Sequence, residues 1–81
     1  MRLVILPRGW VMVGQAKIEN NTLYLSNASV VRIWGTSCGL PELANKGPLK
    51  NTVLDGKCSM EFPMSSVIAT IECNADAWKD Y

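Results

Sequence analysis

Two arginine–tryptophan pairs carry most of the chemistry that this sequence offers: Arg8 with Trp10, and Arg32 with Trp34. An arginine side chain can hold a phosphate group through two parallel hydrogen bonds, and an indole ring can stack on a base. Arg32 and Trp34 are two residues apart, so in a strand their side chains emerge on the same face. The pairs therefore indicate a site for a phosphate-bearing nucleotide. The competing interpretation is ordinary packing, with the indoles in a core or an interface.

A glycine-containing stretch, residues 35–39, follows the second pair directly. Its backbone N–H groups can converge on an anion close to a helix start at Pro41, although the spacing differs from that of a P-loop. Thr36 and Ser37 offer hydroxyl groups, and Lys50 offers a positive charge. A flexible connection is the alternative. The predicted ligand-binding residues are Arg8, Trp10, Arg32, Trp34, Gly35, Thr36, Ser37, Gly39, Lys50 and Thr52.

Groups suited to catalysis are scarce in this sequence. It contains no histidine, which is the commonest general base and metal ligand. Cys38 has no such partner base, and the three cysteines form no C-x-x-C pair. Asp55 precedes Gly56 and is expected to cap its own turn, while Glu42 belongs to the first turn of a predicted helix. We therefore expect no enzymatic activity, no catalytic residue, no metal site and no cofactor.

The elements that must position these groups are mostly β-strands. Short apolar or alternating stretches are separated by Gly, Pro and Asn, a pattern typical of a small barrel or a strongly bent antiparallel sheet. We predict a single mainly β domain, residues 1–81, with five to six strands and one short helix. The predicted strands are residues 2–6, 10–18, 22–26, 28–34, 57–62 and 66–73, residues 51–54 fit a further short strand, and the helix is 41–46.

Four residues predict where the strands bend or turn. Gly14, inside a run of β-formers, indicates a bulge or a sharp bend. Asn20 and Asn21 suit a tight hairpin because asparagine tolerates positive φ angles. Asn27 is expected to form a second turn between two strands.

Strand alternation also predicts which side chains are buried. Val31 and Ile33 are expected to face the core, which would leave Arg32 on the opposite face. Cys58 and Cys73 are in phase with apolar neighbours and are expected to be small core residues. After the last strand, Asn74 is expected either to cap a short helix or to begin a tail that lies on a neighbour.

Composition and charge limit the classes of function. Apolar residues make up 48% of the chain and charged residues 19%, which indicates either a dense β core or apolar surface buried between subunits, and we predict the second, a homo-oligomer. A net charge of +1 provides no global basic field for non-specific nucleic-acid binding. No segment approaches the roughly 20 apolar residues of a membrane span, and the apolar run at residues 3–6 is too short for an export signal. We expect a soluble, cytoplasmic protein with no membrane partner.

The central motif resembles that of a family of small phage-encoded proteins. The pattern reads R-x-W-G-T, G-L-x-E-L, G-P and T-V-L-D, and its four parts begin at Arg32, Gly39, Gly47 and Thr52. An early G-W-V-x-V-G segment, residues 9–14, and the late strand, residues 66–73, fit the same family. Cys38 departs from it, since members often lack a cysteine in this loop. The resemblance implies a phage origin, but no particular activity.

Some small phage proteins, called sponges, sequester the nucleotide signals of bacterial immune systems without catalysis. This chain is similar to them in size and in its loop rich in Arg, Trp and Gly, which is an analogy of kind. We therefore predict an anti-defence sponge in the cytoplasm of an infected bacterium, which holds a nucleotide-derived signal as a homo-oligomer. One alternative is a phage protein that inhibits a host protein through Trp34, Leu40 and Leu43 as apolar anchors. Another is a small nucleic-acid-binding barrel.

Overall fold

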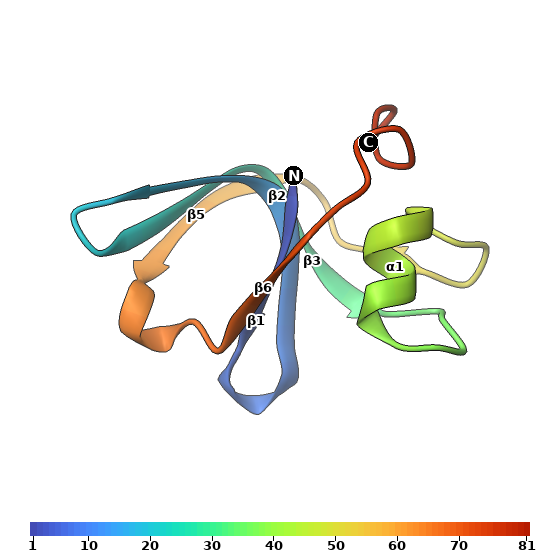
Figure 1. Ribbon diagram of the computed structural model, residues 1–81, viewed down its shortest axis with the longest axis horizontal. Coiled ribbons are helices and arrows are strands. Elements are labelled where there is room, and N and C mark those ends of the chain that lie inside the picture. The colour runs from blue at the N-terminus through green and yellow to red at the C-terminus, as the bar shows by residue number, and fades with distance from the viewer.

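The computed structural model describes all of residues 1–81 and consists of a six-stranded antiparallel sheet with one α-helix (Figure 1). The elements in chain order are β1 (Arg2–Leu6), the 3-10 turn η1 (Pro7–Gly9), β2 (Trp10–Glu19), β3 (Thr22–Ile33), α1 (Leu40–Lys46), β4 (Val53–Leu54), β5 (Cys58–Pro63), the 3-10 turn η2 (Met64–Ser66) and β6 (Ala69–Glu72). The strand order is β4-β3-β2-β1-β6, and β5 pairs with the first half of β3. The sheet is not closed, so the predicted mainly β fold is confirmed as a bent sheet. The only α-helix has seven residues, and no helix here is long and apolar enough to cross a membrane.

A bulge interrupts the long hairpin formed by β2 and β3. Val13 pairs with Ser29 but Gln15 pairs with Ser26, so β3 contributes two residues to this interval and β2 contributes one. The extra residue is accommodated at Asn27, whose φ is 52°. β3 therefore continues through Asn27, and the predicted turn between two separate strands is wrong. The asparagine does adopt the left-handed conformation on which that prediction was based.

Gly14 occupies the β2 side of the same bulge, as predicted. A Cβ atom added to Gly14 would lie 2.7 Å from the Cβ of Ala28, which is closer than carbon atoms can approach without a shift. The absence of a side chain at Gly14 thus allows β2 and β3 to approach each other closely at the bulge, where the sheet bends. The hairpin beyond the bulge turns at Asn20 and Asn21, whose φ angles of 51° and 61° confirm the predicted tight turn.

Both faces of the sheet are covered, but by different parts of the chain. On one face, α1 and the C-terminal tail pack against the strands; the buried residues are Leu3, Val11, Val13, Val31, Leu40, Leu43, Ala44, Cys73 and Trp78. On the other face, the sheet is bent so that side chains of β5, η2 and the residue after η2 pack against the strands. The buried residues there are Val4, Met12, Leu23, Leu25 and Ala28. Leu3 and Val4 of β1 therefore point to opposite faces of the sheet, and both are fully buried.

The C-terminal tail, residues 73–81, completes the first of these faces without forming a helix or a strand. Trp78 is buried, and its indole N–H donates a hydrogen bond to the Ala44 carbonyl oxygen of α1 at 3.1 Å. The Asn74 backbone N–H donates to the same oxygen at 2.9 Å. The Tyr81 hydroxyl is hydrogen-bonded to the hydroxyl of Ser29, which is fully buried in β3. The tail thus folds back on its own chain.

Three further details differ from the sequence-based predictions. Ile33 is 53% exposed because it is the last residue of β3, where the register of pairing with β4 shifts. Cys58 is exposed at the start of β5, whereas Cys73 is buried as predicted. The predicted strand over residues 66–73 shortens to β6, because Ser66 belongs to η2 and pairing with β1 extends only from Ala69 to Glu72. Ile68, just before β6, is largely exposed.

Candidate functional site

A hollow of about 370 Å³ lies between the turn that joins β1 to β2 and the end of β3. Figure 1 shows this turn at the bottom of the view, and β3 ending above and to the right of it, beside the lower end of α1. The lining residues are Arg8, Gly9, Trp10, Val11, Val30, Val31, Arg32 and Asp55. The molecule has three other hollows, but this is the only one lined by arginine or by tryptophan. Three of the predicted ligand-binding residues, Arg8, Trp10 and Arg32, therefore meet here.

The β1–β2 turn presents Arg8 to the hollow. Arg8 has a φ of 67° and Gly9 a φ of 78°, and a positive φ is unfavourable for a residue with a large side chain. Such strained residues are concentrated at binding and catalytic sites. Arg8 forms no ion pair, so its guanidinium is available to an anion. Trp10 follows as the first residue of β2 and is 53% exposed, with its ring available for stacking.

Arg32 is held in place by Asp55, which also lines the hollow. The Nε and Nη2 atoms of Arg32 donate to Oδ1 and Oδ2 of Asp55 at 2.8 and 2.9 Å, as in a bidentate guanidinium–carboxylate pair. These hydrogen bonds lower the pKa of Asp55 and raise the pKa of Arg32. The Nη1 atom of Arg32 has no protein partner. Asp55 was predicted only to cap its own turn, so its pairing with Arg32 corrects that prediction.

The glycine-containing loop, residues 35–39, is hydrogen-bonded to a carboxylate of the same chain, that of Glu42. The backbone N–H groups of Ser37 and Cys38 both donate to Oε1 of Glu42, each at 3.0 Å. The Cys38 hydrogen bond is the main cause that lowers the pKa of Glu42, and the Ser37 N–H and Lys46 add to the effect. Two of the N–H groups that were predicted to receive a phosphate are therefore already paired with the Glu42 carboxylate, in the first turn of α1.

Glu42 yields a testable prediction about pH. Because its pKa is lower in the folded chain, the carboxylate stabilises the fold above the unfolded value of about 4.3, and this stabilisation is lost as the pH falls through the folded value. In urea unfolding, we expect Glu42→Gln to unfold at a lower urea concentration than the wild type at about pH 7, and we expect this difference to shrink as the pH is lowered towards about 3. The control is Glu61→Gln, since Glu61 forms no ion pair. A difference in urea unfolding midpoint between Glu42→Gln and the wild type that does not change with pH would contradict the prediction.

Trp34, Gly35 and Thr52 hold two loops together. The Thr52 hydroxyl donates to the Trp34 carbonyl oxygen at 2.7 Å and accepts from the Leu49 N–H at 3.0 Å. Gly35 lies so close to Asn51 and Thr52 that there is no room for a side chain. The roles of Gly35 and Thr52 are therefore structural. The Trp34 ring is 41% exposed and lies outside the hollow.

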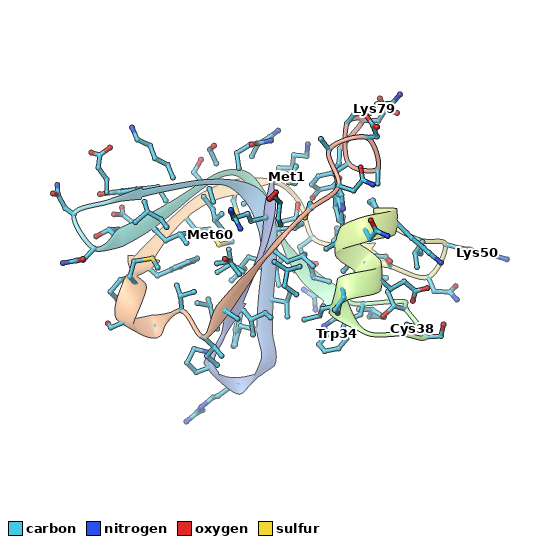
Figure 2. All side chains as sticks on the ribbon, in the orientation of Figure 1. Met1, Trp34, Cys38, Lys50, Met60 and Lys79 are labelled. Carbon is cyan, nitrogen blue, oxygen red and sulfur yellow. The ribbon has the colours of Figure 1, made fainter.

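The remaining predicted residues do not converge on one point. Figure 2 shows Lys50 at the tip of the loop after α1, directed away from the body of the molecule, and Trp34 on the lower side near Cys38. Gly39 precedes α1 with a φ of 83°, and Thr36 is half-buried with a buried hydroxyl that has no hydrogen-bond partner. The expected pocket of Arg32 and Trp34 with the glycine loop is thus replaced by one of Arg32 with Arg8 and Trp10.

The ends of the paired strands bring these three residues to one hollow. The pairing of β2 with β3 ends at Met12 and Val30, and Trp10 and Arg32 each lie two residues beyond that last pair. Arg8 lies in the turn that leads into Trp10. The sequence neighbours of these residues do not reveal that they line the same hollow. The sequence reasoning also missed Asp55 as a site residue, since 23 residues separate it from Arg32.

Comparison with known proteins adds no assignment at this point. No protein-family model matches the chain, and no curated protein matches it closely enough to indicate a relative. No group of three or more His, Cys, Asp or Glu side chains is placed to hold a metal ion.

Proposed function

We propose that this protein is a non-catalytic binding protein that holds a phosphate-bearing nucleotide in the hollow between the β1–β2 turn and the end of β3. The observation that carries the proposal is the convergence of Arg8, Trp10 and Arg32 on that hollow from the β1–β2 turn, β2 and β3. Its volume of about 370 Å³ lies near the lower end of the roughly 300–1,000 Å³ of ligand pockets. It therefore suits one nucleotide unit.

Each of the three residues has a distinct role in the proposed complex. Arg8, which has no protein partner, binds a phosphate oxygen, and the free Nη1 atom of Arg32 binds a second one. The exposed ring of Trp10 stacks on the base, as aromatic side chains do in sequence-tolerant nucleotide sites. Val11 and Val30 provide apolar wall beside the ring.

The biological setting that we propose is the one implied by the phage resemblance. In that setting the protein acts in the cytoplasm of an infected bacterium and captures a nucleotide-derived signal of the host's immune response. Capture needs no reaction, only affinity and enough copies of the protein. Assembly into a homo-oligomer is part of this proposal, and it would use exposed apolar residues near the hollow.

The test is binding of a nucleotide panel, measured by isothermal titration calorimetry. The panel contains 3′,5′-cyclic mononucleotides, cyclic dinucleotides and ADP-ribose. We expect the wild type to bind at least one of them and Trp10→Ala to bind it about 5- to 150-fold more weakly, because stacking contributes about 1–3 kcal/mol per base. Trp34→Ala is the matched control, since it removes another exposed indole from outside the hollow. A folded protein that binds no member of the panel would refute the proposal.

Inhibition of a host protein is the second candidate, favoured by a strip of exposed apolar residues. Ile33 and Val53 pair across β3 and β4, and with Trp34 they are 39–53% exposed. Leu40 and Leu43 belong to α1 and are buried in the core that the helix covers, so their predicted role as exposed anchors is wrong. Sedimentation analysis separates the two uses of the strip. A wild-type oligomer that Trp34→Glu dissociates supports self-assembly, whereas a monomer that retains a host protein through Trp34 supports inhibition.

A further inference from the structure

Asp55 gives the hollow an unusual charge for an anion site. Its carboxylate lines the hollow together with the two arginines, and these three are the only charged residues of the lining. The formal charges of Arg8, Arg32 and Asp55 therefore sum to +1. A site for a nucleoside triphosphate or another multiply charged phosphate would gain from having no carboxylate at all, since like charges at close range repel.

The pairing geometry limits the phosphate group in a second way. Asp55 takes the Nε–H and one Nη2–H of Arg32, which form the side-on edge of the guanidinium that can clamp two oxygens of a terminal phosphate. Both N–H groups of Nη1 and the second N–H of Nη2, at the end of the side chain, remain for a ligand. Arg8 approaches from the β1–β2 turn and Arg32 from β3, so the two arginines contact the phosphate from separate elements. Contacts from two directions, with one edge of Arg32 already taken, suit a phosphate whose other two oxygens are bonded to carbon.

We infer that Asp55 is a specificity-determining residue that restricts the hollow to singly charged phosphodiesters and excludes doubly charged phosphate monoesters. This inference rests on the proposed function. A phosphodiester carries one negative charge, which balances the net charge of the hollow. A phosphate monoester carries close to two negative charges above its second pKa of about 6, and the second charge meets the Asp55 carboxylate without a further cation to offset it.

The experiment compares two ligands that share a base and a sugar. Each of the four ribonucleoside 3′,5′-cyclic monophosphates is titrated into the wild-type protein at about pH 8, and so is the matching 5′-monophosphate, which is doubly charged there. For any base that binds, we expect the phosphodiester to bind at least about tenfold more tightly. Asp55→Asn is expected to tighten monoester binding and to reduce the ratio to below about threefold.

A second measurement uses the wild-type protein alone, in case Asp55→Asn alters the fold. Lowering the pH from about 8 to about 5 converts the monoester to a single charge. Hydrogen bonds from Arg32 keep the pKa of Asp55 below its usual value, so the group that changes charge over this range is the phosphate of the ligand. The preference for the phosphodiester should shrink accordingly.

The outcomes separate this inference from the function on which it rests. A monoester that binds as tightly as its phosphodiester at about pH 8 overturns the role of Asp55 but leaves nucleotide binding in place. A preference that persists unchanged in Asp55→Asn also overturns it. Failure of both ligand types to bind for every base, together with failure of the cyclic dinucleotides and ADP-ribose, overturns the proposed function and the inference together.

Discussion

Replacing Gly35 by alanine is expected to lower the free energy of unfolding by about 2–4 kcal/mol. Gly35 has a φ of 71°, and an added Cβ would lie 2.3 Å from the carbonyl carbon of Asn51 and from the nitrogen of Thr52. Both neighbours are backbone atoms, so neither can rotate away as a side chain would. The two loops would have to separate, which would also break the hydrogen bond from Thr52 to the Trp34 carbonyl. For a domain whose total stability is expected to be about 4–12 kcal/mol, this is a large fraction.

Gly56→Ala is the matched control for Gly35→Ala. Gly56 has no neighbouring heavy atom within 4 Å of an added Cβ, and its φ is not positive. Alanine there should leave stability unchanged or raise it by up to about 1 kcal/mol, because it restricts the unfolded chain. Urea unfolding followed by tryptophan fluorescence measures both variants. Equal unfolding midpoints for Gly35→Ala and Gly56→Ala would show that the backbone of Asn51 and Thr52 can move away from residue 35 at no cost in stability.

Replacing Trp78 by alanine is expected to cost about 3–5 kcal/mol, the range for removing a large buried side chain. Trp78 is only 2% exposed and packs in the cluster under α1, although it comes from a tail with no regular secondary structure. The variant also loses the hydrogen bond from the indole to Ala44. The same urea experiment measures the effect, and we expect the tail and α1 to loosen together.

Two further variants separate the causes of this loss. Trp78→Phe keeps an aromatic ring but removes the N–H donor, and the Ala44 carbonyl retains its bond from Asn74, so a cost of about 1–2 kcal/mol is expected. Trp10→Ala removes an exposed indole and should change stability by less than about 1 kcal/mol. If Trp78→Ala were no more destabilising than Trp10→Ala, the tail would not be part of the core.

Local patterns were sufficient to predict most of the strands. Residue types with strong conformational preferences predicted four features: the first strand, the hairpin turn at the paired asparagines, the bulge at Gly14, and the short helix between Pro41 and Gly47. Such preferences act within a few residues and are visible in any window of sequence. The prediction at Asn27 failed because a left-handed asparagine fits a bulge as well as a turn. Only pairing with β2 distinguishes the two.

The candidate site was predicted by residue type but not by grouping. Arg8, Trp10 and Arg32 were chosen for their chemistry, yet the expected partner of Arg32 was Trp34, two residues away. The exposed indole of Trp34 lies outside the hollow. In the glycine-containing loop beside it, the N–H groups of Ser37 and Cys38 are hydrogen-bonded to Glu42. Asp55 was read as a turn residue because its distant partner has no signature in the local sequence.

The amino-acid sequence was therefore enough to indicate a small barrel or a strongly bent β-sheet with one helical turn or two, and the residue types considered for nucleotide binding. Whether the sheet closes, and which of those residues meet, was decided by the fold. The ends of β2 and β3 bring Trp10 and Arg32 to the same hollow, and the return of the chain after β4 brings Asp55 to the Arg32 guanidinium. Contacts of this kind join residues more than twenty positions apart, and they arise only when the strands have paired.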